Sequence, residues 1–264
     1  MVAVNPTRLR FQIADLLNDF TTPANFHRGL SVLFDFYANR TLRSGESIKV
    51  QSIHRSYNLP HPVTRQLKID LKPRAQQNTA ETLALADELW TDPYLEVKQV
   101  AIYLLNQTPV DNPQPILDRL QHWLVYDIDR ALISDIWASG ASQLQTTFPA
   151  VWESFIQSYL SQQDPKMISI GLSGLRQSLE AQDFKNTPVI FRLISPLVRN
   201  PQNANLKDLR KVIDALAQQS PTETAYFLHQ MAALSNSIET KRLIKQCLPY
   251  FPQALQAELK TDLK

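Results

Sequence analysis

The sequence contains very little cysteine and glycine. Cys247 is the only cysteine among 264 residues, which excludes an internal disulfide and a metal site of the CxxC type. The chain has 5 glycines against 17 prolines, and so few glycines argue against many β-hairpins. The prolines fall between segments of apolar periodicity, where they are typical of helix starts and helix ends.

Long apolar runs and common catalytic motifs are also missing. No apolar run approaches the roughly 20 residues of a membrane span, and the N-terminus lacks the apolar core of a signal peptide. We therefore expect a soluble cytoplasmic protein. The sequence has no GxGxxG, GxxxxGK[ST], HExxH or GxSxG motif. Its 5 histidines are scattered, without carboxylates or cysteine at ligand spacing, so we expect neither a metal nor a cofactor.

The charge balance is mildly basic. The formal net charge is +2 and the sequence pI is about 8.6. With 44% hydrophobic and 20% charged residues the chain is globular in composition rather than disordered. This charge is compatible with nucleic-acid binding but does not require it, because such proteins usually show a more basic domain or a clustered basic face.

Apolar residues recur three and four positions apart along most of the chain, which predicts amphipathic helices. About a dozen helices with short connectors are expected, and their irregular spacing fits degenerate HEAT-like repeats of ~40 residues. No linker or shift in composition divides the chain. We predict an all-α fold, a right-handed α-α superhelix of HEAT-like helical repeats, forming a single domain over residues 1–264. Residues 41–56 are expected to form a loop followed by a short helix or turn around residues 48–54.

The clearest helical unit lies at residues 57–105. We expect the helix that starts near His61 to end before Pro73, because proline cannot continue the hydrogen-bond ladder. The last helix of the unit carries Glu96 and Lys98 on its polar side, opposite an apolar face. Helix, tight turn and helix in this arrangement is the unit of an α-solenoid.

Basic residues form a row on the first helix of this unit. Arg65, Lys68 and Lys72 are spaced i, i+3 and i+7, so they share one helical face. Such a face could contact phosphates, or it could be a solvated surface balanced by the 25 acidic residues. Further basic residues recur along the chain, and the candidates among them are Lys98, Lys166, Arg210 and Lys211.

Aromatic residues cluster in the middle of the chain. Trp123, Tyr126, Trp137 and Trp152 could line a groove and stack on bases or sugars, although aromatic residues at helical spacing more often belong to a core. Trp90 closes an apolar helix face and is expected to be core.

Two stretches together point to a known family. The sequence YNLPHPVTRQL, followed by LADELWTDPYLEVKQVAIYLL, is similar to the AlkD-like DNA alkylation repair family. The resemblance is best over residues 57–140 and continues loosely to about residue 235. It implies a HEAT-like α-solenoid that binds duplex DNA and excises alkylated purines as a DNA glycosylase.

The family's catalytic aspartate can be placed on this sequence. Aligning IDRALISDIW with the family segment puts Asp135 in the aspartate position, and Ala131 where a tryptophan stands four residues earlier. Trp123 and Asp127 have the same four-residue spacing, so a shifted alignment offers an alternative pair. That shift breaks the apolar register after the aspartate.

Other family positions that contact DNA are only partly kept. The helix that begins near Lys166 retains one charge but lacks the expected arginines. Ala215 stands where a later helix usually carries an aromatic residue, while Arg210 and Lys211 keep its basic side. These departures favour DNA binding over strong excision activity.

The resulting prediction is a DNA-binding protein that contacts the duplex backbone through a basic concave face. Asp135 is the catalytic candidate if alkylated purines are excised. A second prediction from another class is a non-enzymatic HEAT-like scaffold that binds a protein partner, because solenoids often serve that purpose and a fold does not assign a function.

Overall fold

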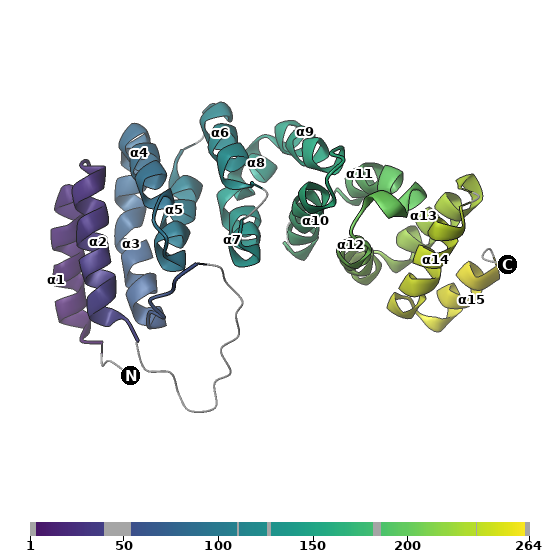
Figure 1. The fold of residues 1–264 in the computed structure, drawn as a ribbon, viewed down its shortest axis with the longest axis horizontal. Coiled ribbons are helices and arrows are strands. Elements are labelled where there is room, and N and C mark those ends of the chain that lie inside the picture. The colour runs from purple at the N-terminus through teal and green to yellow at the C-terminus, as the bar shows by residue number, and fades with distance from the viewer. Residues whose placement is uncertain are drawn as a thin grey trace. The chain divides into compact units, whose positions relative to one another are not determined.

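The structure is a computed structural model, and within the described residues it is helical apart from connectors and one isolated bridge between Arg55 and Tyr94 (Figure 1). The predicted all-α repeat fold is confirmed. None of the helices in the described part of the chain is long and apolar enough to cross a membrane. The described residues are 4–39, 54–109, 111–125, 128–181, 186–235 and 237–261.

The chain forms two compact units. The first contains residues 1–123 and 127–147, and the second contains residues 124–126 and 148–264. The single domain and the right-handed superhelical course stay predictions. Most of the loop expected at residues 41–56 lies outside the described residues.

The first unit contains two rows of helices, and each helix in a row contacts the next. The helices of one row are α1 (Pro6–Leu16), α3 (His61–Gln77), α5 (Leu95–Gln107) and α7 (Arg130–Asp135). The other row contains α2 (Pro23–Tyr37), α4 (Thr79–Trp90) and α6 (Gln114–Trp123), and a stacked pair of tryptophans joins α6 to α4. The last helix of the unit is α8 (Ser142–Thr147).

The second unit repeats this two-row arrangement. A glycine permits close packing of two of its helices, because a Cβ at Gly171 of α10 would lie 2.9 Å from Leu160 Cδ2 of α9. The helices of one row are α9 (Pro149–Leu160), α11 (Thr187–Arg199), α13 (Pro221–Leu234) and α15 (Gln253–Thr261), and those of the other are α10 (Pro165–Glu180), α12 (Leu206–Gln219) and α14 (Ile238–Cys247).

Helix α3 does not end before Pro73, so that prediction was wrong. The helix continues to Gln77 with Pro73 inside it. Proline removes the hydrogen bond to the carbonyl four residues earlier, which is that of Ile69. Pro73 and the 53% exposed Ile69 both lie on the solvent side of α3, so water can satisfy this carbonyl. The helix remains anchored by four buried residues on its other side, namely Val63, Leu67, Leu71 and Ala75.

The two charged residues that were expected on a polar side of α5 are buried. Glu96 and Lys98 are each only 8% exposed. The Glu96 carboxylate accepts hydrogen bonds from the Ser56 hydroxyl at 2.6 Å and from the backbone N–H groups of Tyr57 and Asn58 at 3.0 and 2.8 Å. Asn58 has a φ of 53°, a left-handed conformation that asparagine tolerates better than most residues. Glu96 therefore fixes the backbone that leads into α3.

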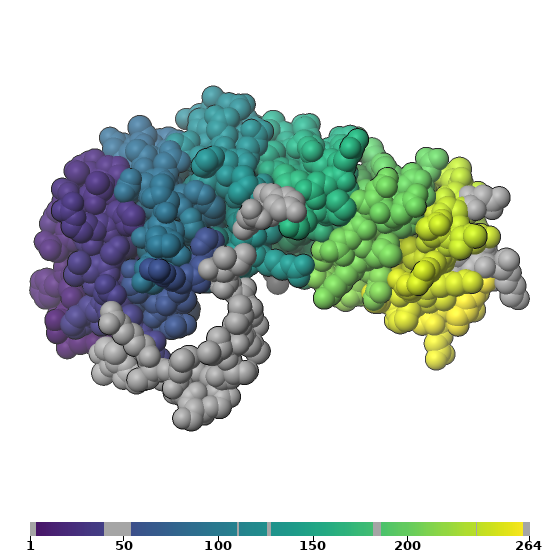
Figure 2. Space-filling view, in the orientation of Figure 1, coloured from purple at the N-terminus to yellow at the C-terminus, as the bar shows by residue number. Residues whose placement is uncertain are grey.

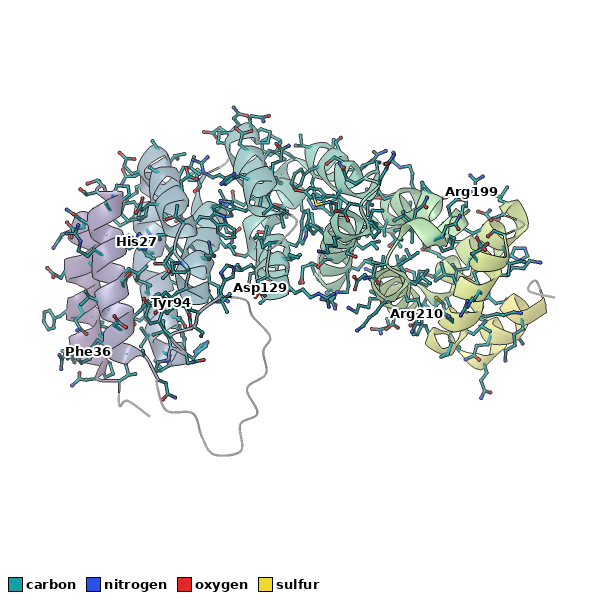
Figure 3. All side chains as sticks on the ribbon, in the orientation of Figure 1. His27, Phe36, Tyr94, Asp129, Arg199 and Arg210 are labelled. Carbon is teal, nitrogen blue, oxygen red and sulfur yellow. The ribbon has the colours of Figure 1, made fainter. Side chains whose placement is uncertain are left out.

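His27 connects the second row of the first unit through two carboxylates (Figure 3). Its Nδ1 lies 3.0 Å from Glu88 Oε1 and its Nε2 lies 2.6 Å from Asp92 Oδ2. Burial lowers the pKa of His27, but the hydrogen bonds and negative charges of Glu88 and Asp92 outweigh it, so the pKa is raised above its usual 6.5. The protonated imidazole donates from both nitrogens and ties α2 to the end of α4.

This clamp should make the stability of the protein depend on pH. Because the folded pKa of His27 is raised, its contribution is complete below the unfolded value of about 6.5 and is lost as pH rises through the folded value. We expect the free energy of unfolding, measured by urea denaturation between pH 6 and pH 9, to fall by about 1 kcal/mol across this range. His27→Gln should flatten the slope. An unchanged slope in that variant would assign the pH dependence to other groups.

Candidate nucleic-acid interface

Helix α5 leaves one stripe of its surface partly open. Eight of its 13 residues are buried, whereas Gln99, Tyr103 and Asn106 are half-buried and follow one another at helical spacing. Helix α3 packs beside α5, and so do α7 and the turn that follows it. The open stripe of α5 therefore lies between residues of α3 and residues of α7.

Asp135 lies at this stripe. It is the last residue of α7, and a π-helical turn, Ile136–Gly140, follows it. Such turns inside helices are frequent at functional sites. Gln99 Nε2 donates a hydrogen bond to Asp135 Oδ2 at 2.8 Å. Burial raises the pKa of Asp135 above its usual 3.8, and the Gln99 hydrogen bond and the charge of Lys68 act in the opposite direction. The carboxylate is thus half-buried, oriented by α5 and within the electrostatic reach of α3.

Lys68 of α3 completes the group. The Tyr103 hydroxyl donates to the Lys68 carbonyl at 2.7 Å, and Lys68 Nζ lies 5.5 Å from the centre of the Tyr103 ring. We call Lys68, Gln99, Tyr103 and Asp135 the Asp135 cluster. Within the described part of the chain, no group of three or more His, Cys, Asp or Glu residues could hold a metal ion.

The basic residues predicted on α3 extend from this cluster. Arg65, Lys68 and Lys72 are all exposed, and we call them the α3 basic row. Among the described residues neither Arg65 nor Lys72 forms an ion pair. Their charges are therefore available to an anionic ligand that approaches the Asp135 cluster.

Lys98 is not part of this surface. Its ammonium group donates to the Trp90 carbonyl and lies 4.5 Å from the centre of the Trp90 ring. Burial lowers the pKa of Lys98. The predicted phosphate contact is therefore wrong for this residue, because its side chain is enclosed between α4 and α5.

The tryptophans of the first unit are also structural. Trp123 is 1% exposed and stacks on the half-buried Trp90 with ring centres 4.3 Å apart. Trp137 is 4% exposed. Trp123 thus belongs to the core, and the prediction that it contacts nucleic acid was wrong. Tyr126, the other aromatic candidate, lies outside the described residues.

The basic candidates of the second unit have different surroundings. Lys166 is exposed in the first turn of α10. Lys211 Nζ lies 3.0 Å from Asp208 Oδ1, so an acid on its own helix partly balances its charge. Arg210 is half-buried and donates to the Tyr250 hydroxyl at 3.3 Å and to Gln246 at 3.4 Å (Figure 3). These contacts hold Arg210 on α12 toward α14.

Gln99 and Tyr103 were missed from the sequence. Both are polar or amphipathic residues four positions apart on a helix that is otherwise largely apolar, and that spacing is the signal that could have identified them. Their partners are 36 and 35 residues away in the sequence. The pairing itself was therefore not accessible without the packing of α3, α5 and α7.

A comparison with family models decides the family. The model described as DNA alkylation repair enzyme matches residues 49–233. The chain belongs to this family. The match includes the whole Asp135 cluster and the α3 basic row, and it begins after α1 and α2. None of the curated proteins compared with the chain matches it. Membership in the DNA alkylation repair enzyme family supports a function related to DNA repair and DNA as the partner.

The orientation of Asp135 can be tested directly. Removing the Gln99 hydrogen bond in Gln99→Leu should raise the pKa of Asp135 further, because that bond stabilises the charged carboxylate. The measurement is an NMR titration of the Asp135 carboxyl carbon. Asn106→Leu, on the same stripe two turns away, should leave the titration unchanged. Equal titration curves for wild type and Gln99→Leu would contradict the hydrogen bond in solution.

Proposed function

We propose that this protein binds duplex DNA through the α3 basic row, with the backbone passing over the Asp135 cluster. The observation that carries the proposal is the exposure of Arg65, Lys68 and Lys72 beside a half-buried carboxylate on the same side of the first unit. Cationic side chains that neutralise phosphates release condensed counterions, which supplies most of the free energy of non-specific DNA binding.

The geometry of the row suits a regular polyanion. Arg65 and Lys72 are seven positions apart, which corresponds to about 10 Å along a helix axis. Successive phosphates of one strand advance about 3.4 Å along the duplex axis, so the α3 basic row is about as long as three phosphate-to-phosphate steps. Lys68 lies between the two and is also close to the Asp135 charge. Arg65 and Lys72 are therefore the residues we expect to contribute most to phosphate binding.

The test is the salt dependence of binding to duplex DNA. Arg65→Ala with Lys72→Ala should weaken binding and reduce the slope of log K against log salt by about 1.8, or about 0.9 for each lost contact. The matched control is Arg10→Ala with Lys260→Ala, which removes the same charge from exposed sites on α1 and α15. Binding is measured by fluorescence anisotropy at several salt concentrations.

Two outcomes would contradict the proposal. The first is an equal loss of slope in the matched control, which would mean that only net charge matters. The second is an absence of duplex binding at low salt, which would favour the alternative of a scaffold that binds a protein partner.

Excision of alkylated purines is the second candidate function, and the fixed carboxylate of Asp135 favours it. Cleavage of an N-glycosidic bond develops positive charge on the sugar, and an oriented carboxylate stabilises that charge before it forms. The ionised form is required, and burial raises the pKa of Asp135. Activity should therefore increase as pH rises through that pKa. Tyr103 supplies an aromatic ring one helical turn from Gln99, in contact with Lys68.

This candidate is tested by release of methylated bases from alkylated DNA. Asp135→Asn retains the shape of the side chain but loses its charge, and we expect base release to fall by about 10²-fold or more while DNA affinity changes little. No release by wild type would end the excision candidate and leave the binding proposal in place. Equal release by both proteins would remove Asp135 from the mechanism.

A further inference from the structure

The first helical hairpin exposes apolar side chains on one face. Phe11 of α1 is 73% exposed, and Val32 and Phe36 of α2 are 67% and 44% exposed. The Arg8 guanidinium lies 4.3 Å from the centre of the Phe36 ring, which joins the two helices into one surface. We call the exposed surface of α1 and α2 the hairpin face.

The hairpin face lies at the edge of the first unit. Helix α1 packs on α3 and α2 packs on α4. Phe36 lies on the side of the hairpin away from α3 (Figure 3), and no other described helix is seen beyond the purple surface of α1 and α2 in Figure 2. The solvent-facing surface of an amphipathic helix is usually polar. This hairpin instead presents three large apolar residues to solvent.

The charges on α2 are ordered around the apolar centre. A helix turns by about 100° per residue, so Arg28, Val32 and Asp35 lie within about 60° of one another around the axis of α2. All three are exposed. They lie on the side of α2 opposite its core residues, which are Phe26, Leu30, Leu33, Phe34 and Tyr37.

Helix α1 has the same order. Arg8, Phe11 and Asp15 are exposed and lie within about 60° of one another on its face. Each helix thus carries an arginine, then an apolar residue, then an aspartate. When a helix with this pattern packs against an antiparallel copy of itself, each arginine faces the aspartate of the other copy and the apolar residues meet at the centre.

Both helices can satisfy this pattern at once. The contact between Arg8 and Phe36 sets the level of α1 against α2. In the antiparallel hairpin this contact and the close approach of Gly29 to Leu16 place the midpoint of Arg8 and Asp15 within about two residues of the midpoint of Arg28 and Asp35, or about 3 Å along the axis. One two-fold axis across the hairpin therefore aligns both helices with their copies.

We propose that the hairpin face binds a second copy of the chain in an isologous, antiparallel dimer. Phe11 and Val32 form its apolar centre, and Arg8 of each copy pairs with Asp15 of the other. The hairpin precedes the residues matched by the family, and the α3 basic row is on other helices. The interaction therefore does not depend on DNA binding. A surface formed by two helices is small, so we expect dissociation constants in the micromolar range, about 1–100 µM.

The test is sedimentation equilibrium of the full chain over a range of concentrations. The mass of the wild type should rise from 30.2 kDa toward twice that value as concentration increases, and high salt should weaken the association. Phe11→Ser should stay monomeric. Because Phe11 is 73% exposed, this variant should keep its fold, which circular dichroism verifies.

Charge exchange distinguishes this arrangement from other dimers. In Arg8→Asp both pairings of α1 become acid against acid, and in Asp15→Arg both become base against base. The dissociation constant of the dimer should therefore rise at least about tenfold in each variant alone. An equal mixture of the two restores both opposite-charge pairings and should dimerise like the wild type. Three outcomes would each overturn the proposal. The wild type could be entirely monomeric at about 100 µM, which is about 100-fold above the lowest dissociation constant expected here. Phe11→Ser could be dimeric, or the mixture of the two charge variants could remain monomeric.

Discussion

Burial of two charged residues of α5, Glu96 and Lys98, is the constraint on which the first unit depends. Glu96 and Lys98 are enclosed among helices, and a buried charge is costly unless it is paired or hydrogen-bonded. The chain supplies those partners from neighbouring elements. The turn before α3 donates three hydrogen bonds to Glu96, and the end of α4 accepts one from Lys98. Satisfying two charges on one helix thereby fixes the start of α3 and the end of α4 against it.

The same helix organises the candidate interface. Gln99 and Tyr103 lie on the partly open stripe of α5, and each contacts a different neighbour, α7 or α3. Asp135 and Lys68 are consequently held on packed helices rather than on loops, which is the condition for a precisely oriented site. The partial burial that raises the pKa of Asp135 also strengthens its interaction with a nearby positive charge, because solvent screening is reduced. A single helix therefore supports both the fold and the chemistry proposed for it.

Two surfaces of the first unit have different compositions. The α3 basic row and the Asp135 cluster together form a surface that is basic around Asp135, and they lie within the residues matched by the DNA alkylation repair enzyme family. The hairpin face is apolar with paired charges and lies before that match. Membership in the family bears on the first surface, whereas the second is argued from the order of its side chains. In the proposed dimer each copy keeps its own α3 basic row.

The sequence by itself determined the helical class, the family and the position of Asp135 and of the α3 basic row, because periodicity and local motifs depend on residues close together in the chain. Only the tertiary structure decided which polar residues are covered. The sequence around Lys98 predicted an exposed polar face, and the sequence around Trp123 allowed an aromatic groove. Helical spacing alone does not show whether another helix covers either residue. Gln99 meets its partner only after α5 and α7 pack together. Burial and long-range pairing depend on neighbours that are distant in sequence, and helical periodicity carries no information about them.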